Sequence, residues 1–97
     1  MAFVQIIDIK TTKFDEIQQL EDEWRQATEG KRTLRRSIVA RDRNDANRYL
    51  ILAFFDSYES AMENSGLPET TEFGQKQAAL CDGPMQFTDL DVIEDQD

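Results

Sequence analysis

The longest apolar run in the chain lies near its middle, where seven consecutive apolar or aromatic residues extend from Tyr49 to Phe55. Because neither alternating face of this run carries a polar residue, it predicts a strand buried on both sides in the interior of a sheet. Asp56 and Ser57 follow at once and suit the cap of a helix, and Glu59 is placed to complete a capping box with Asp56. The pattern predicts a central strand that leads directly into a helix.

Three other segments predict strands: 2–9, 33–41 and 85–94. The first is apolar on both faces apart from Gln5 and Asp8, so we expect it in the sheet interior as well. The second has a mixed pattern in which Arg36 shares a face with Ile38. Residues 42–47 are rich in Asp and Asn, which favour turns, and they predict a hairpin that leads into the central strand.

Helical periodicity is clearest before residue 30. Apolar residues recur there at three- and four-residue spacing and form one stripe: Phe14, Ile17, Leu20, Trp24 and Ala27. Thr11 or Thr12 is expected to cap this helix and Gly30 to stop it. After the central strand, residues 58–64 predict a short helix that breaks at 65–68. Residues 69–81 predict another helix, with Phe73, Gln77 and Leu80 on its inner side.

The resulting order is β-α-β-β-α-β, and we expect residues 1–97 to form a single α+β domain. With right-handed crossovers this order gives the ferredoxin-like arrangement, a four-stranded antiparallel sheet of order 4-1-3-2 with the helices on one face. The other face would still present apolar side chains, from Tyr49, Ile51, Ala53, Phe55 or their neighbours. An exposed apolar face of this kind promotes aggregation unless it is covered. Pairing of two copies about a two-fold axis would cover it.

Charge is distributed unevenly along the chain, whose net charge is −9. Residues 31–48 carry seven cations and two acids. This basic segment suits an anion or the acidic half of a partner subunit, with a solvated hairpin as the alternative. No apolar run is long enough to span a membrane and no signal peptide is evident, so we expect a cytoplasmic protein without a membrane partner. Cys81 is the only cysteine, which excludes an internal disulfide.

The passage Phe54–Met62 and the interrupted helical region Asn64–Phe73, together with the element order, resemble the dimeric α+β barrel superfamily that includes the antibiotic biosynthesis monooxygenase-like proteins. The resemblance covers essentially the whole chain. The segments Glu23–Arg32 and Ala79–Pro84 are similar to small uncharacterised actinobacterial members.

This resemblance implies a homodimer whose two sheets close a barrel, with a pocket in each subunit between the sheet and the helices. Some members oxidise polycyclic aromatic compounds without metal or flavin, and others bind haem. The Asn–Trp–His set of haem-degrading members is missing here, because the chain has no histidine. We therefore expect no cofactor. Two functions stay open: a cofactor-independent monooxygenase-like enzyme acting on a small aromatic compound, and a non-catalytic small-molecule-binding or protein-interaction module.

Candidate site residues follow from the predicted interior positions. Trp24 is expected to line a pocket between helix and sheet, with Gln5, Tyr49 and Arg36 as further substrate-binding residues. Asp8 is the candidate catalytic residue, because an acid in apolar surroundings can have a raised pKa and act as a general base. The alternative for Asp8 is a strand-end residue that reaches solvent, and for Arg36 an ion pair across a dimer.

Other chemistry is weakly supported. Zinc and iron sites use clusters of His or Cys, and this chain has no His and one Cys, so no metal is expected. Cys81 has no His to activate it and is expected to be structural. The RNA-recognition motif shares the element order, but Tyr49 stands where that motif has glycine, and a net charge of −9 opposes phosphate binding. No nucleic-acid partner is expected.

Overall fold

Four strands and three helices make up the computed structural model, which describes residues 2–97. Along the chain they are β1 (Phe3–Lys10), α1 (Phe14–Ala27), β2 (Arg36–Arg41), β3 (Arg48–Phe55), α2 (Tyr58–Ser65), α3 (Pro68–Ala79) and β4 (Gln86–Asp91). The strands form one antiparallel sheet in the order β2-β3-β1-β4. This is the predicted order counted from the opposite edge, so the ferredoxin-like α+β fold is confirmed.

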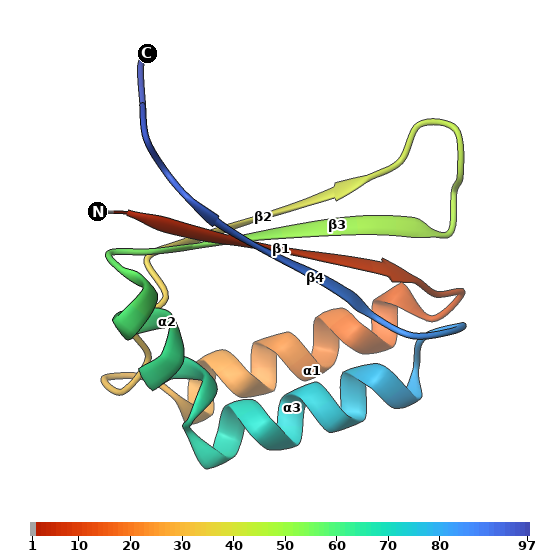
Figure 1. Cartoon of the computed structure of the whole chain (residues 1–97). Helices are drawn as coiled ribbons and strands as arrows, with labels where there is room; N and C mark the ends of the chain where they lie inside the picture. Colours follow the sequence, from red (N-terminus) through yellow and green to blue (C-terminus); the bar gives the residue numbers. More distant parts are fainter. Residues whose placement is uncertain (1) are drawn as a thin grey trace.

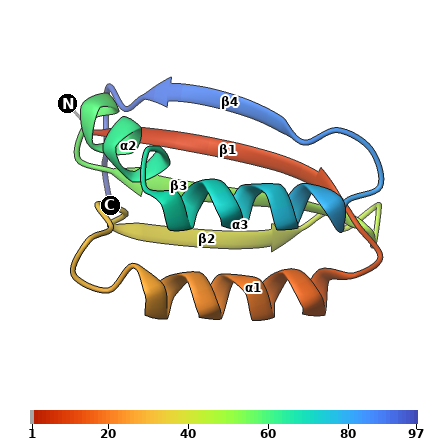
Figure 2. The same cartoon turned by 90° about the horizontal axis from the view of Figure 1, so that it is seen from below.

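All three helices lie on the same side of the sheet, and the opposite side is open (Figure 1). From the helix side, α1 and α3 lie next to each other and run in opposite directions, with α1 below β2 and α3 nearer the centre of the sheet (Figure 2). No helix within residues 2–97 is long and apolar enough to cross a membrane.

The two faces of the sheet follow from strand alternation. Phe3, Ala53 and Phe55 point toward the helices and form a buried cluster with Ala61 of α2. The open face carries the alternate positions: Val4, Ile6, Ile38, Leu50, Leu52, Phe54 and Leu90. An apolar open face is therefore present. It is formed by the neighbours of Tyr49, Ile51, Ala53 and Phe55 rather than by those residues.

Several predicted element ends are wrong, because side chains make longer-range bonds there. Neither Thr11 nor Thr12 caps α1, which has Lys13 as its N-cap. The Thr11 hydroxyl instead accepts the Lys13 N–H at 2.9 Å and donates to the Leu80 carbonyl at 2.7 Å, which ties the end of β1 to the end of α3. β2 begins at Arg36 rather than at Thr33, since Thr33 hydrogen-bonds to Ser60 and Asn64 near α2.

The cap of α2 is partly as predicted. Ser57 is the N-cap, and its side chain accepts the backbone N–H of Ser60 at 3.0 Å. Asp56 does not complete a capping box, because its carboxylate binds the Arg35 guanidinium at 2.6 and 2.9 Å. α1 ends at Ala27, before Gly30, and Gly30 takes φ +79° in the following turn, a conformation that glycine adopts without strain.

Candidate functional site

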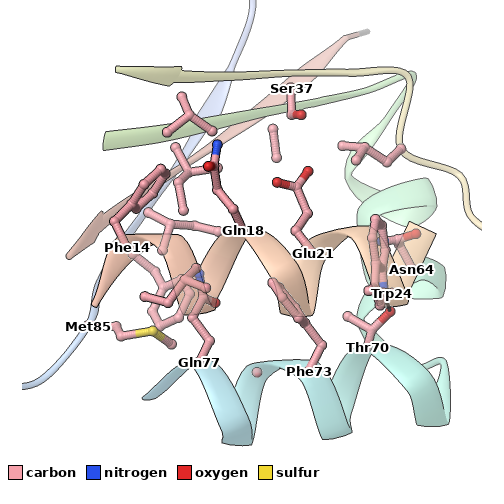
Figure 3. A pocket seen from close by; sticks show the side chains of 18 of the residues that line it. Phe14, Gln18, Glu21, Trp24, Ser37, Asn64, Thr70, Phe73, Gln77 and Met85 are labelled. Atoms are coloured by element: carbon pink, nitrogen blue, oxygen red, sulfur yellow. Dashed lines mark hydrogen bonds between the residues drawn. The ribbon is translucent and has the colours of Figure 1, made fainter. Parts of the chain in front are cut away.

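A cavity of about 170 Å³ lies between the sheet and the helices α1 and α3. Its walls are mainly aromatic and aliphatic, with Phe14, Trp24, Phe73 and Met85 among them (Figure 3). The space is comparable to the engineered cavity of about 150 Å³ that binds benzene. Concave apolar sites with few polar groups are typical of small-molecule sites.

Small residues on three elements help to leave this space open. Ser37 of β2, Ala53 of β3 and Gly74 of α3 all line the cavity. A Cβ atom at Gly74 would meet nothing within 4 Å. The interior contains volume that larger side chains at these positions would fill.

Trp24 lines the cavity, as predicted from its place on the apolar stripe. The side chain is buried, and its Nε1–H donates to the Thr70 hydroxyl of α3 at 2.9 Å. Its ring lies 6.0 Å from that of Phe73, and the Arg32 guanidinium lies over the indole, 6.0 Å from the ring centroid. The indole is held in one orientation, with part of its apolar surface facing the cavity.

Glu21 is the one charged side chain that lines the cavity within residues 2–97. Its carboxylate accepts the Arg25 Nε–H at 3.0 Å, and Arg25 Nη2 donates to the Ser37 hydroxyl at 2.9 Å. Figure 3 shows Glu21 rising from α1 toward Ser37 on the sheet. This chain of contacts fixes a carboxylate at the edge of an apolar space, where it is placed to accept a proton.

Two buried amides, those of Asn64 and Gln77, also line the cavity. Asn64 Oδ1 accepts the backbone N–H of Thr33 at 3.2 Å. Figure 3 places Asn64 beside Trp24 and Gln77 toward Met85, at opposite ends of the cavity. Sequence reasoning did not select either amide or Glu21 as site residues, although helical spacing placed Gln77 on the inner side of its helix.

Asp8 is not in this cavity, because it points to the open face of the sheet. Arg48 donates to its carboxylate from Nε at 3.1 Å and from Nη2 at 2.8 Å. These hydrogen bonds stabilise the ionised form and lower the pKa of Asp8 below its ordinary value of 3.8. The expectation of a raised pKa at Asp8 is wrong, because β3 supplies a cation where apolar surroundings were assumed.

The other three expected site residues also lie outside the walls of the cavity. Gln5 is on the helix-facing side, and its amide donates to Asp89 of β4 at 3.0 Å. Tyr49 stacks on Phe14 with ring centroids 4.1 Å apart, so it supports a residue of the cavity wall. Arg36 lies exposed on the open face, 5.9 Å from the Phe54 ring. Of the predicted set, the structure places only Trp24 directly at the cavity.

The described part of the chain offers few groups for metal binding or for thiol catalysis. No three His, Cys, Asp or Glu side chains within residues 2–97 are grouped so that they could hold a metal ion. Burial raises the pKa of the Cys81 thiol, which donates to the Gln77 carbonyl at 3.3 Å. A raised pKa disfavours the nucleophilic thiolate.

No protein-family model matches the sequence, and no curated protein matches it either. Solved structures match over nearly the whole chain. SnoaB, a cofactor-independent oxygenase from Streptomyces nogalater, superposes with a TM-score of 0.80 at 10% identity, over 97% of this chain and 95% of that one. Rv0793 from Mycobacterium tuberculosis gives 0.80 at 13% identity over 100% of both chains.

A third structure, described as an antibiotic biosynthesis monooxygenase, gives a TM-score of 0.74 at 13% identity, over 97% of this chain and 100% of that one. The chain has the fold of the antibiotic biosynthesis monooxygenases. At these identities the similarity establishes the fold alone. The closer similarity to actinobacterial proteins stays a prediction.

Proposed function

We propose that this protein is a cofactor-independent monooxygenase of a small aromatic compound, which it binds in the cavity between the sheet and α1 and α3. The observation that carries the proposal is the aromatic-lined cavity of about 170 Å³, in which Glu21 is the single carboxylate among the described lining residues. The fold shared with a cofactor-independent oxygenase supports it. We also propose a cytoplasmic location and a homodimer in which the open faces of the two sheets pack against each other.

A phenol is the simplest substrate that fits this chemistry. The Glu21 carboxylate accepts the phenolic proton, and the resulting phenolate gives up electrons to O₂ more readily than the phenol does. One oxygen atom becomes a ring carbonyl and the other leaves as water, so that phenol plus O₂ gives a quinone plus water. The substrate supplies all the electrons, and no external reductant is needed.

The roles of the lining residues follow from their positions. Trp24 and Phe14 supply flat apolar surface for a ring. Arg25 keeps Glu21 oriented through its hydrogen bond at 3.0 Å, and Ser37 fixes Arg25 in turn. Asn64 has its amide oxygen engaged by Thr33 and lies beside Trp24 at one end of the cavity.

The test is oxygen uptake by the purified protein with a panel of one- and two-ring phenols, in the presence of a metal chelator. With ¹⁸O₂, the quinone is expected to carry one labelled oxygen. Glu21→Gln should lower kcat by about 100-fold or more, because general-base catalysis contributes that much. Glu16→Gln, on the exposed side of α1, is the matched control and should leave kcat unchanged.

Three outcomes would count against the proposal. Full activity in the Glu21→Gln variant would remove Glu21 as the base. Activity lost on chelation would exclude a cofactor-independent reaction. Binding of phenols without oxygen uptake would leave a non-catalytic small-molecule-binding module as the function.

A further inference from the structure

The Gln77 side chain places an amide in the wall of the cavity. The residue is 3% exposed and lines the cavity. Its backbone carbonyl accepts from Leu80 and Cys81, but no described residue hydrogen-bonds to its side-chain amide. Figure 3 shows the side chain rising from α3 into the space beneath the sheet.

Within residues 2–97 no fully buried side-chain nitrogen or oxygen lacks a hydrogen-bond partner. The Gln77 amide has no protein partner, so its atoms keep accessible surface although the residue as a whole is buried. Because Gln77 lines the cavity, a molecule inside the cavity is positioned to hydrogen-bond to this amide.

The surroundings limit what that molecule can be. No cationic side chain of residues 2–97 lines the cavity, and the one acid in its wall, Glu21, is already paired with Arg25. An anionic ligand would therefore find no cationic partner in the cavity wall. The volume of about 170 Å³ suits one aromatic ring, by comparison with the cavity of about 150 Å³ that binds benzene.

We infer that Gln77 anchors a neutral, single-ring aromatic ligand by hydrogen-bonding to a hydroxyl or carbonyl group on its ring. This inference rests on the proposed function and specifies the size, charge and polar group of the substrate, together with the residue that orients it. An amide can donate to a carbonyl and can accept from a hydroxyl, so both groups fit. The opposite end of the ring lies toward Trp24 and Asn64.

The test compares two probes of nearly equal shape, p-cresol and p-xylene, in which a hydroxyl replaces a methyl group. Dissociation constants are measured without oxygen by NMR titration, following the indole N–H of Trp24, the only tryptophan. Gln77→Met removes the amide and nearly conserves side-chain volume. Gln75→Met, at an exposed position of the same helix, is the matched control.

In Gln77→Met, the ratio of the p-xylene to the p-cresol dissociation constant should fall about tenfold relative to wild type, which corresponds to one hydrogen bond. The variant should bind p-xylene as wild type does, which also shows that the cavity is intact. Gln75→Met should keep the wild-type ratio.

An unchanged ratio in Gln77→Met, equal weakening of both probes, or the absence of binding by either probe would overturn the assignment. The anaerobic titration separates this inference from the proposed reaction. Selective loss of p-cresol binding in a protein that takes up no oxygen would refute the reaction and keep the role of Gln77. Oxygen uptake by the wild type, together with an unchanged ratio of dissociation constants in Gln77→Met, would support the reaction and refute the role of Gln77.

Discussion

At the residue scale, Asp8 and Glu21 are carboxylates in different surroundings. Asp8 accepts two hydrogen bonds from Arg48, which also donates to Asp42 at 2.9 Å. Glu21 accepts one from Arg25 and borders the cavity. The arrangement around Asp8 holds strands together, and the arrangement around Glu21 leaves carboxylate surface for a ligand.

Replacing Asp8 with Asn should lower the melting temperature at pH 7 by a few degrees, because the charged partner of Arg48 is lost. The pKa of Asp8 is lowered by folding, so its contribution is complete above the ordinary value of 3.8 and disappears as the pH falls through the folded-state pKa. The difference between wild type and variant should therefore be constant from pH 7 to 5 and shrink below pH 4.

Thermal unfolding followed by circular dichroism across this pH range measures the difference. Asp22→Asn, on the exposed side of α1, is the control and should match wild type throughout. A difference between wild type and Asp8→Asn that persists undiminished at pH 2 would contradict an ionic contribution of Asp8.

The sequence predicted where some of these side chains lie, but it did not predict the ion pair of Asp8. Helical spacing correctly placed Trp24 and Gln77 on inner faces, because a helix repeats every 3.6 residues whatever its partners. The ion pair of Asp8 depends on Arg48, 40 residues away, and on the β1–β3 register that sets Lys10 opposite Arg48. Spacing along one strand holds no information on that register.

At the scale of elements, α1 and α3 are joined by specific polar contacts as well as by packing. The Trp24 indole donates to Thr70, and Lys31, beyond the end of α1, pairs with Glu69 at 2.6 Å. Both contacts lie near the start of α3. They keep the helix pair in position beneath the sheet and so maintain one end of the cavity.

Thr70→Val should lower the free energy of unfolding by about 1–2 kcal/mol, because the buried indole N–H loses its acceptor while the side-chain volume is nearly unchanged. Urea unfolding followed by Trp24 fluorescence measures the change. Thr71→Val, at the exposed neighbouring position, should unfold with the wild-type midpoint. Equal midpoints for the two variants would show that the indole hydrogen bond contributes nothing.

The hydrophobic pattern predicted which elements form and in what order, and it was less accurate at their ends. Thr11 has the chemistry of a helix cap, but its hydroxyl bonds to Leu80 from the far end of the chain. Thr33 continues an alternating pattern, yet it bonds to the region of α2. In both cases a tertiary hydrogen bond decides where the element begins.

At the scale of the whole molecule, the two faces of the sheet carry different roles. Because β3 is apolar at every position from Tyr49 to Phe55, its sequence does not say which alternate set faces the helices. In the structure the alternate set that includes Ala53 and Phe55 faces the helices, and these two residues line the cavity. The set centred on Leu52 remains on the open face.

Basic charge in the segment 31–48 is partly neutralised within the subunit. Lys31, Arg35 and Arg48 pair with Glu69, Asp56 and Asp8. Arg36 and Arg41 lie exposed on β2, and Asp89 and Asp91 lie exposed on β4 at the opposite edge of the sheet. Of these four residues only Arg36 belongs to the open-face set, because Arg41, Asp89 and Asp91 pair with helix-facing positions. The proposed homodimer therefore rests on the apolar open face rather than on the charge of the sheet edges.

Leu52 is the position at which the homodimer can be tested, because it lies on β3 between Ile6 of β1 and Ile38 of β2. Wild type should have a solution mass of about 22 kDa, twice the chain mass of 11.2 kDa. Leu52→Lys should be monomeric at micromolar concentration, since dimerisation would bury two unpaired ammonium groups. Light scattering coupled to size-exclusion chromatography gives the mass, and circular dichroism checks that the variant is folded.

Gln19→Lys adds the same charge at an exposed position of α1 and should remain dimeric. A dimeric Leu52→Lys variant would place the contact elsewhere on the molecule, and a monomeric wild type would leave the open face without a partner copy. Loss of the dimer together with an intact cavity would separate assembly from ligand binding. The cavity is lined by residues of one subunit, so p-cresol should bind the folded monomer with an unchanged dissociation constant.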